Sequence, residues 1–163
     1  MRRIISFILI VVMLFCLFGC SHSNKTEMVK PVAVYYCQKD VDYNSGIIVA
    51  DKMDYNDWNG RMLAFLNFYI SAPVKESMDS PFPAGANINA IEYRNDTLRV
   101  QLNALFSRLS ASELTVACAC ITLTLFELTD AYAVSFSYHN GSNETIAVMN
   151  RDNLIFRDLP VNN

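Results

Sequence analysis

The spacing of hydrophobic residues along the chain predicts a mixture of helices and strands. Apolar residues recur at three- and four-residue intervals from Met62 to Ile70, and the segment from Leu114 to Phe126 is apolar on nearly all sides. The first spacing is typical of an amphipathic helix, and the second segment predicts a helix that is covered on most of its surface. Ser110 and Glu113, just before the second segment, have the spacing of a capping box.

Six short runs have the β-branched and aromatic composition, or the two-residue alternation, of strands. They are residues 32–37, 47–50, 88–93, 98–102, 132–138 and 145–149. The tight turn at residues 94–97 joins two of them into a hairpin with one face in water. The predicted order is ββαββαββ. We expect an α+β fold, with two helices packed on one face of a small mixed or antiparallel sheet.

The N-terminus has the layout of an export signal. Arg2 and Arg3 precede an apolar run at residues 4–14, interrupted only by Ser6, which is short for a membrane span. The sequence Leu-Phe-Gly-Cys at residues 17–20 resembles a bacterial lipobox, in which the cysteine is acylated and becomes the new N-terminus. We therefore expect a lipoprotein signal peptide at residues 1–19 and lipidation of Cys20. An uncleaved signal anchor is the alternative.

This N-terminus predicts an extracytoplasmic protein held to the cell membrane by lipid on Cys20. Polar residues 20–31 then form a tether, and residues 32–158 form a single domain. Cys16 has no small residue before it and is the poorer candidate for lipidation. More than one acyl chain is needed for stable anchoring.

The charge of the chain disfavours nucleic acid as a partner. The full sequence has a net charge of −3, and loss of Arg2 and Arg3 leaves 11 basic against 16 acidic residues, a net charge of −5. An acidic domain is repelled by phosphate backbones and by anionic lipid. We therefore expect the membrane to be reached through the lipid anchor, and the other partners to be envelope proteins or further copies of the chain.

Three cysteines remain after Cys20, and an odd number cannot all pair within one chain. They are Cys37, Cys118 and Cys120. Cys118 and Cys120 are two residues apart on a helix, so they point to different sides and cannot easily bridge each other. No second cysteine pair or nearby histidine completes a metal site. We expect all three to be small buried side chains.

The sequence offers no catalytic set. Its two histidines are His22, in the tether, and His139, in a predicted turn, and neither is placed beside a nucleophile. The loop at residues 40–46 has alternating carboxylates, as calcium loops do, but its glycine is one position late and its flanks are predicted strands. We interpret it as an ordinary hairpin turn. The expectation is a protein that is not an enzyme and that has no cofactor or metal.

Residues 61–138 resemble the GerM domain, the sporulation and spore germination module. The matching segments are residues 68–73, 80–85, 91–102, 104–106, 121–126 and 134–138. The resemblance implies a non-catalytic extracytoplasmic domain, often lipid-anchored, similar to ring-building domains that assemble at membranes during sporulation. This chain has one copy, where some members have two in tandem.

Two functions follow from these observations. The first is an assembly module of the bacterial cell envelope, which contacts other proteins through a sheet edge or a helix face and acts in sporulation or germination. The second is a lipoprotein that binds a small molecule or a cell-wall fragment. Its site would be lined by the aromatic residues Trp58, Tyr35, Tyr36, Tyr43 and Tyr55.

Overall fold

The computed structural model describes residues 31–40, 48–55, 61–138 and 145–154. In chain order these residues form β1 (Pro31–Gln38), β2 (Ile48–Asp54), α2 (Met62–Ser71), β3 (Met78–Asp79), β4 (Ile88–Arg94), β5 (Thr97–Leu102), the 3₁₀ helix η3 (Ala104–Arg108), α3 (Ala111–Leu128), β6 (Ala133–Tyr138) and β7 (Thr145–Asn150). The α+β class and the predicted order are confirmed. The short strand β3 and the helix η3 are additions to that order.

The strands of the described residues are divided between two sheets, where the sequence analysis places them in one. One sheet has the order β2-β1-β3 and the other has the order β4-β5-β6-β7. β5 and β6 are parallel and their neighbours are antiparallel. The parallel pairing arises because η3 and α3 lie between these two strands in the chain, and a crossover of this length permits it.

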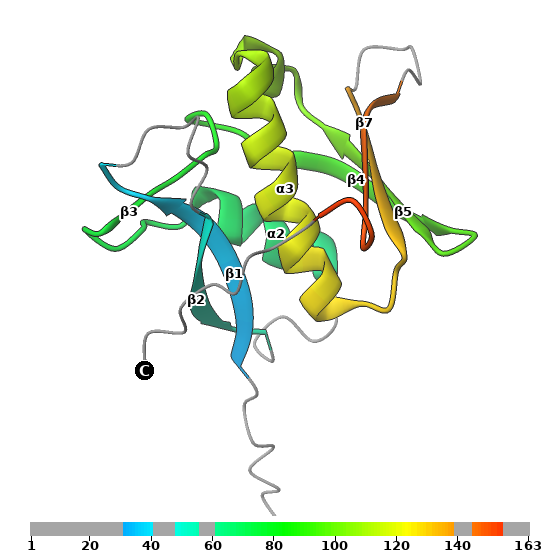
Figure 1. Cartoon of the computed structure of the whole chain (residues 1–163), viewed down its shortest axis with the longest axis horizontal. Helices are drawn as coiled ribbons and strands as arrows, with labels where there is room; N and C mark the ends of the chain where they lie inside the picture. Colours follow the sequence, from blue (N-terminus) through cyan, green and yellow to red (C-terminus); the bar gives the residue numbers. More distant parts are fainter. Residues whose placement is uncertain (1–30, 41–47, 56–60, 139–144, 155–163) are drawn as a thin grey trace, which may run out of the picture.

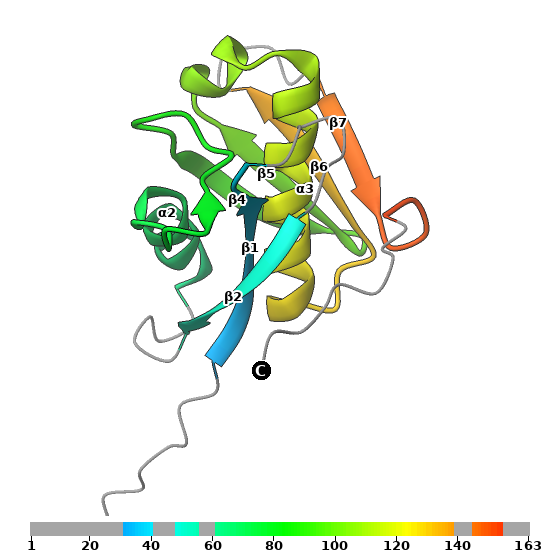
Figure 2. The ribbon, with the colours of Figure 1, turned by 60° about the vertical axis from the view of Figure 1, so that its left-hand side comes forward.

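Helix α3 lies between the two sheets. It packs on β1 on one side and on β7 on the other, and α2 packs on β4 (Figures 1 and 2). Every residue from Ala117 to Leu125 is buried. By length and hydropathy α3 could cross a membrane, but half of that segment is buried inside the domain. It is therefore the core helix that the sequence predicts.

The start of α3 is fixed by the predicted capping box. The Ser110 hydroxyl oxygen accepts a hydrogen bond from the Glu113 N–H at 3.4 Å, and a Glu113 carboxylate oxygen accepts one from the Ser110 N–H at 2.8 Å. These two bonds satisfy backbone donors that have no partner inside the helix.

The end of α3 is held by Arg151, which follows β7. Its guanidinium donates to the carbonyl oxygens of Ala131 at 3.0 Å, Thr129 at 3.1 Å and Phe126 at 3.4 Å. It also lies 4.3 Å from the centre of the Phe126 ring. A cation at a helix C-terminus is favoured by the helix dipole. Arg151 therefore fixes the four-stranded sheet relative to α3.

The two helices hold β1 through the peptide groups of Tyr35. The Tyr35 N–H donates to the Thr124 hydroxyl of α3 at 3.3 Å, and the Tyr69 hydroxyl of α2 donates to the Tyr35 carbonyl oxygen. Thr124 in turn donates to the carbonyl oxygen of Cys120 at 3.0 Å. β3 pairs with β1 only at Cys37 and Gln38. At Tyr35 no strand lies on that side of β1, and the side chains of Thr124 and Tyr69 bind its peptide groups instead. This is how the small sheet is joined to the rest without a continuous ladder.

An aromatic cluster surrounds this junction. Tyr69 is fully buried, and its ring centre lies 5.1 Å from that of Tyr36 and 5.2 Å from that of Phe82. Burial raises the pKa of Tyr69 well above its ordinary value and raises the pKa of Tyr36 to about 12. Both hydroxyls therefore stay protonated at neutral pH and act as hydrogen-bond donors.

The proline-rich turn places Phe82 in this cluster. The Ala86 N–H donates to the Pro83 carbonyl oxygen at 2.9 Å, and Gly85 between them has a φ of 78°. A side chain at Gly85 would meet Leu105 at 3.2 Å in addition to the strained backbone. The turn therefore needs glycine at this position.

We predict that Tyr69→Phe destabilises the domain by about 1–3 kcal/mol, because it leaves the Tyr35 carbonyl oxygen without its donor in the protein interior. The free energy of unfolding from urea titration measures this. The matched control is Tyr132→Phe, which removes a hydroxyl that binds Asp152 at the surface. An equal loss of stability in both variants would contradict the role assigned to Tyr69.

Candidate functional site

The face of the four-stranded sheet that points away from α3 is the candidate functional site. Along β5 and β6 the residues Leu98, Val100, Leu102, Val134 and Phe136 are buried in the core. The residues between them point to the opposite face, because successive side chains of a strand alternate. In the described part of the chain no helix or strand covers this face, which we call the open sheet face (Figure 1).

The strand register aligns the open sheet face in two rows across all four strands. One row is Glu92, Arg99, Ser135 and Val148. The second row is Ala90, Gln101, Ser137 and Thr145. A hollow of about 500 Å³ lies over these rows and extends to Arg94, Asn95 and Thr97 at the β4–β5 turn. This volume is within the range of small-ligand sites, but the lining is mostly polar where such sites are mostly apolar.

The charges of the open sheet face are available to a partner. Glu92 and Arg99 are cross-strand neighbours, and Arg94 lies beside the turn. All three side chains are exposed. The ion pair among the described residues joins Asp51 of β2 to Lys75, which precedes β3, and involves none of these three side chains. A partner with complementary charges could therefore pair with Glu92 and with the two arginines.

The two edges of this sheet differ in how they are protected. At β4 the side-chain amide of Asn67 accepts from the Ile88 N–H at 2.7 Å and donates to the Ile88 carbonyl oxygen at 3.0 Å. Asn67 thus pairs with the strand as a neighbouring backbone would. At the opposite edge, β7 exposes 53% of Val148, which also lines the hollow. An unprotected edge strand is a potential site of pairing with another chain.

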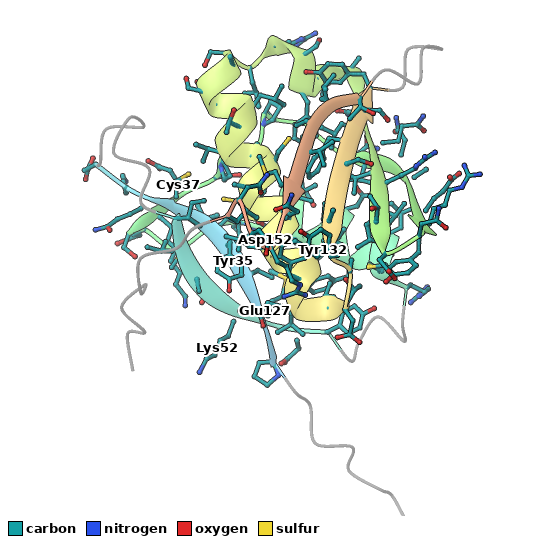
Figure 3. All side chains as sticks on the ribbon, turned by 45° about the vertical axis from the view of Figure 1, so that its right-hand side comes forward. Tyr35, Cys37, Lys52, Glu127, Tyr132 and Asp152 are labelled. Carbon is teal, nitrogen blue, oxygen red and sulfur yellow. The ribbon has the colours of Figure 1, made fainter. Side chains whose placement is uncertain are left out.

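Of the aromatic residues considered as a ligand site, the three that the structure describes do not line this hollow. Tyr36 is buried against Tyr69, and Tyr55 packs edge-on against Phe65 at 5.0 Å. The Tyr35 hydroxyl donates to Glu127 at 2.9 Å, and Figure 3 shows this pair on β1 and α3. The interpretation of an aromatic pocket is therefore wrong for these three residues, because Tyr36 and Tyr55 pack their rings within the domain and the Tyr35 hydroxyl binds Glu127. Trp58 and Tyr43 lie outside the described residues.

The described residues contain no group of three or more histidine, cysteine, aspartate or glutamate side chains that could hold a metal ion. Asp40 is described, but residues 41–47 of the possible calcium loop lie outside this part of the chain, as do His22 and His139. Asp51 is paired with Lys75. Cys20 and the whole export signal also precede the described residues, so lipidation stays a prediction.

All three cysteines of the domain are buried thiols, as the sequence predicts. Burial raises the pKa of Cys118 to about 12. Interaction with the Cys120 thiol lowers the pKa of Cys37, and burial raises the pKa of Cys120 well above its ordinary value. The two thiols are therefore neighbours in the fold. No pattern in the sequence indicates that these two residues are neighbours, because they are far apart in the chain.

Comparisons with known proteins identify the fold. No protein-family model and no curated protein matches the sequence. Among solved structures, the first GerMN domain of the sporulation protein GerM from Bacillus subtilis has a TM-score of 0.54 and 14% identity, and the match covers 68% of this chain and 84% of that domain. The tandem GerMN domains of the same protein have a TM-score of 0.51 and 21% identity over 76% of this chain.

These matches show that the chain contains a GerM-like domain, as the resemblance in its sequence predicts. This chain spans 44% of the length of the tandem structure. Because the identities are low, the likeness is one of fold, and the role of this chain has to be argued from its own surface.

Proposed function

We propose that this protein is a non-catalytic, lipid-anchored module of the bacterial cell envelope that binds a partner protein, or another copy of itself, through the open sheet face. The observation that carries the proposal is a four-stranded sheet with one face packed on the core and the other face uncovered among the described residues. That face is hollowed over about 500 Å³ and exposes Glu92, Arg94 and Arg99.

The polar character of this face supports a reversible contact. Partners that dissociate keep interfaces about as polar as the rest of their surface, and matched charges set the orientation of docking. A lipid on Cys20 would hold the domain near other membrane proteins and raise their effective concentration. Weak contacts would then be enough to organise a complex at the membrane.

The solved GerM structures come from a sporulation protein. They support the part of the proposal that places this chain in an envelope process such as sporulation or germination. The proposed extracytoplasmic location rests on the N-terminal sequence.

Binding of a small molecule or cell-wall fragment is the second candidate, and the hollow favours it. Uncharged donors and acceptors of the kind that hydroxyl-rich ligands use line the hollow, at Gln101, Ser135, Ser137 and Thr145.

Purified protein heated with cell-wall muropeptides would show a raised midpoint of unfolding if this function is right. Replacing Ser135 and Gln101 by alanine would abolish that rise.

We predict that the fatty acid is attached to Cys20. Cells fed an alkyne-tagged fatty acid should label the wild-type protein and Cys16→Ala, whereas Cys20→Ala should take up no label, because only Cys20 follows a small residue in a lipobox-like sequence. Gel fluorescence of the isolated protein measures this. Unlabelled wild-type protein that keeps residues 1–19 would instead establish the uncleaved signal anchor.

We predict that Arg99→Gln reduces complex formation at the membrane. Loss of one charge contact worth about 1 kcal/mol corresponds to about fivefold weaker binding. Native electrophoresis of gently solubilised membranes measures the complex-bound fraction. Glutamine is chosen because glutamate at this position would lie directly opposite Glu92 and repel it.

The matched control for this experiment is Lys52→Gln, which removes the same charge from an exposed position on β2 (Figure 3). Its complex-bound fraction should equal that of the wild type. Migration of the wild-type protein as a monomer under all conditions, or an equal loss in both variants, would count against the open sheet face as the contact surface.

A further inference from the structure

We propose that Cys37 and Cys120 form a disulfide that joins β1 to α3 in the exported protein. The inference rests on the extracytoplasmic location in the proposed function, since disulfides form and persist in oxidising compartments. It goes beyond that function because it assigns a covalent modification to two side chains inside the domain.

The packing of β1 on α3 brings these residues together. The Tyr35 N–H of β1 donates to the Thr124 hydroxyl of α3 at 3.3 Å. Cys37 lies two residues further along the strand, and Cys120 lies one turn earlier on the helix. Thr124 also donates to the Cys120 carbonyl oxygen at 3.0 Å, so this turn of α3 faces β1. The strand and the helix therefore remain in contact from Tyr35 to Cys37.

The Tyr35 hydroxyl donates to Glu127 of α3 at 2.9 Å, so the face of β1 that carries Tyr35 and Cys37 is turned toward α3. Cys120 lies two turns before Glu127 on the same side of the helix, which makes the two thiols neighbours, and each thiol affects the pKa of the other. Cys37 is 8% exposed and Cys120 is fully buried. Both are free thiols in this structure. Two thiols that face each other across one strand–helix contact need a smaller movement to reach bonding distance than residues on separate elements would.

Cys118 is the cysteine left over. It lies two residues before Cys120, and residues at that spacing point to different sides of a helix. Its thiol is fully buried, and with burial it raises the pKa of Tyr138 of β6, which belongs to the four-stranded sheet. Cys118 therefore faces away from β1, and the odd number of cysteines in the domain is accounted for by one pair and one buried thiol.

Formation of the bond needs a two-electron oxidant, and we assign this role to a disulfide-containing thiol oxidant of the extracytoplasmic space. The Cys37 thiolate attacks one sulfur of the oxidant's disulfide and releases the other sulfur as a thiolate. The Cys120 thiolate then attacks Cys37 and releases the second sulfur. Two protons leave the protein's thiols, and the oxidant gains two electrons and becomes a dithiol.

Cys120 is inaccessible once α3 covers β1. The exchange therefore belongs to folding after export, before the core closes. The closed loop would run from residue 37 to residue 120 and contain α2, β3, β4 and β5, so the bond would tie the strand next to the tether to the core helix.

The test is site-resolved alkylation of the protein isolated from cell membranes. The protein is denatured, alkylated without reduction, then reduced and alkylated with a second, isotopically distinct reagent, and the label on each cysteine is read by mass spectrometry. Cys37 and Cys120 should carry only the second label, and a linked peptide pair should be found before reduction. Cys118 should carry only the first label.

A second experiment tests whether Cys37 pairs with Cys120 independently of where the protein is located in the cell. Purified, reduced and denatured protein is refolded with oxidised glutathione. If the bond forms here but the protein from cells has all three thiols reduced, the pairing holds and the extracytoplasmic location is wrong. If Cys37 and Cys120 carry the first label in both arms, or if Cys118 is found in the bond, the proposal is overturned.

The variants test the consequence for stability. Oxidised wild-type protein and Cys118→Ala should each melt about 10 °C above their reduced forms, because the bond closes a long loop of the unfolded chain. Cys37→Ala should melt at the same temperature with and without reductant, and should leave Cys120 open to alkylation. Equal melting of the oxidised and reduced wild-type protein would overturn the stabilising effect.

Discussion

The fold depends on hydrogen bonds between one strand, β1, and side chains of two helices. The N–H of Tyr35 is bound by Thr124 and its carbonyl oxygen by Tyr69, at a position where β1 has no strand on that side. A backbone group in a protein interior must have a partner, and here hydroxyls supply it. This arrangement lets α3 lie between two separate sheets. It also leaves the outer face of the larger sheet uncovered among the described residues.

The hydrophobic pattern predicts the elements of this fold but not how they are joined. The capping box of Ser110 and Glu113, the apolar α3 and the alternating strand β5 all depend on local sequence, and all were predicted correctly. The division into two sheets depends on the contact of Tyr35 with Thr124, which lie 89 residues apart. A pattern shows which face of an element is buried, but it does not show which element covers that face.

The same limit applies to the candidate site. Alternation in residues 98–102 predicts one face of the hairpin in water, and the structure confirms it. The rows that continue this face onto Ser135 and Val148 follow from the parallel placement of β6 beside β5, which the sequence does not specify. The tyrosines failed as ligand candidates because Tyr35 and Tyr36 use their hydroxyls to bind Glu127 and the Tyr69 carbonyl oxygen. Because these hydroxyls bind groups of the domain itself, they are not free to bind a ligand. The surface left for a partner is polar and charged.

The central claim is that the open sheet face meets its partner at the membrane of the living cell. A photoreactive amino acid at Ser135, in the middle of that face, tests this most directly, with the same residue at the exposed Glu76 as the control. After illumination of intact cells, the account predicts a discrete higher-mass adduct from position 135 and none from position 76. Monomer alone from position 135, or the same adduct from both positions, would contradict it.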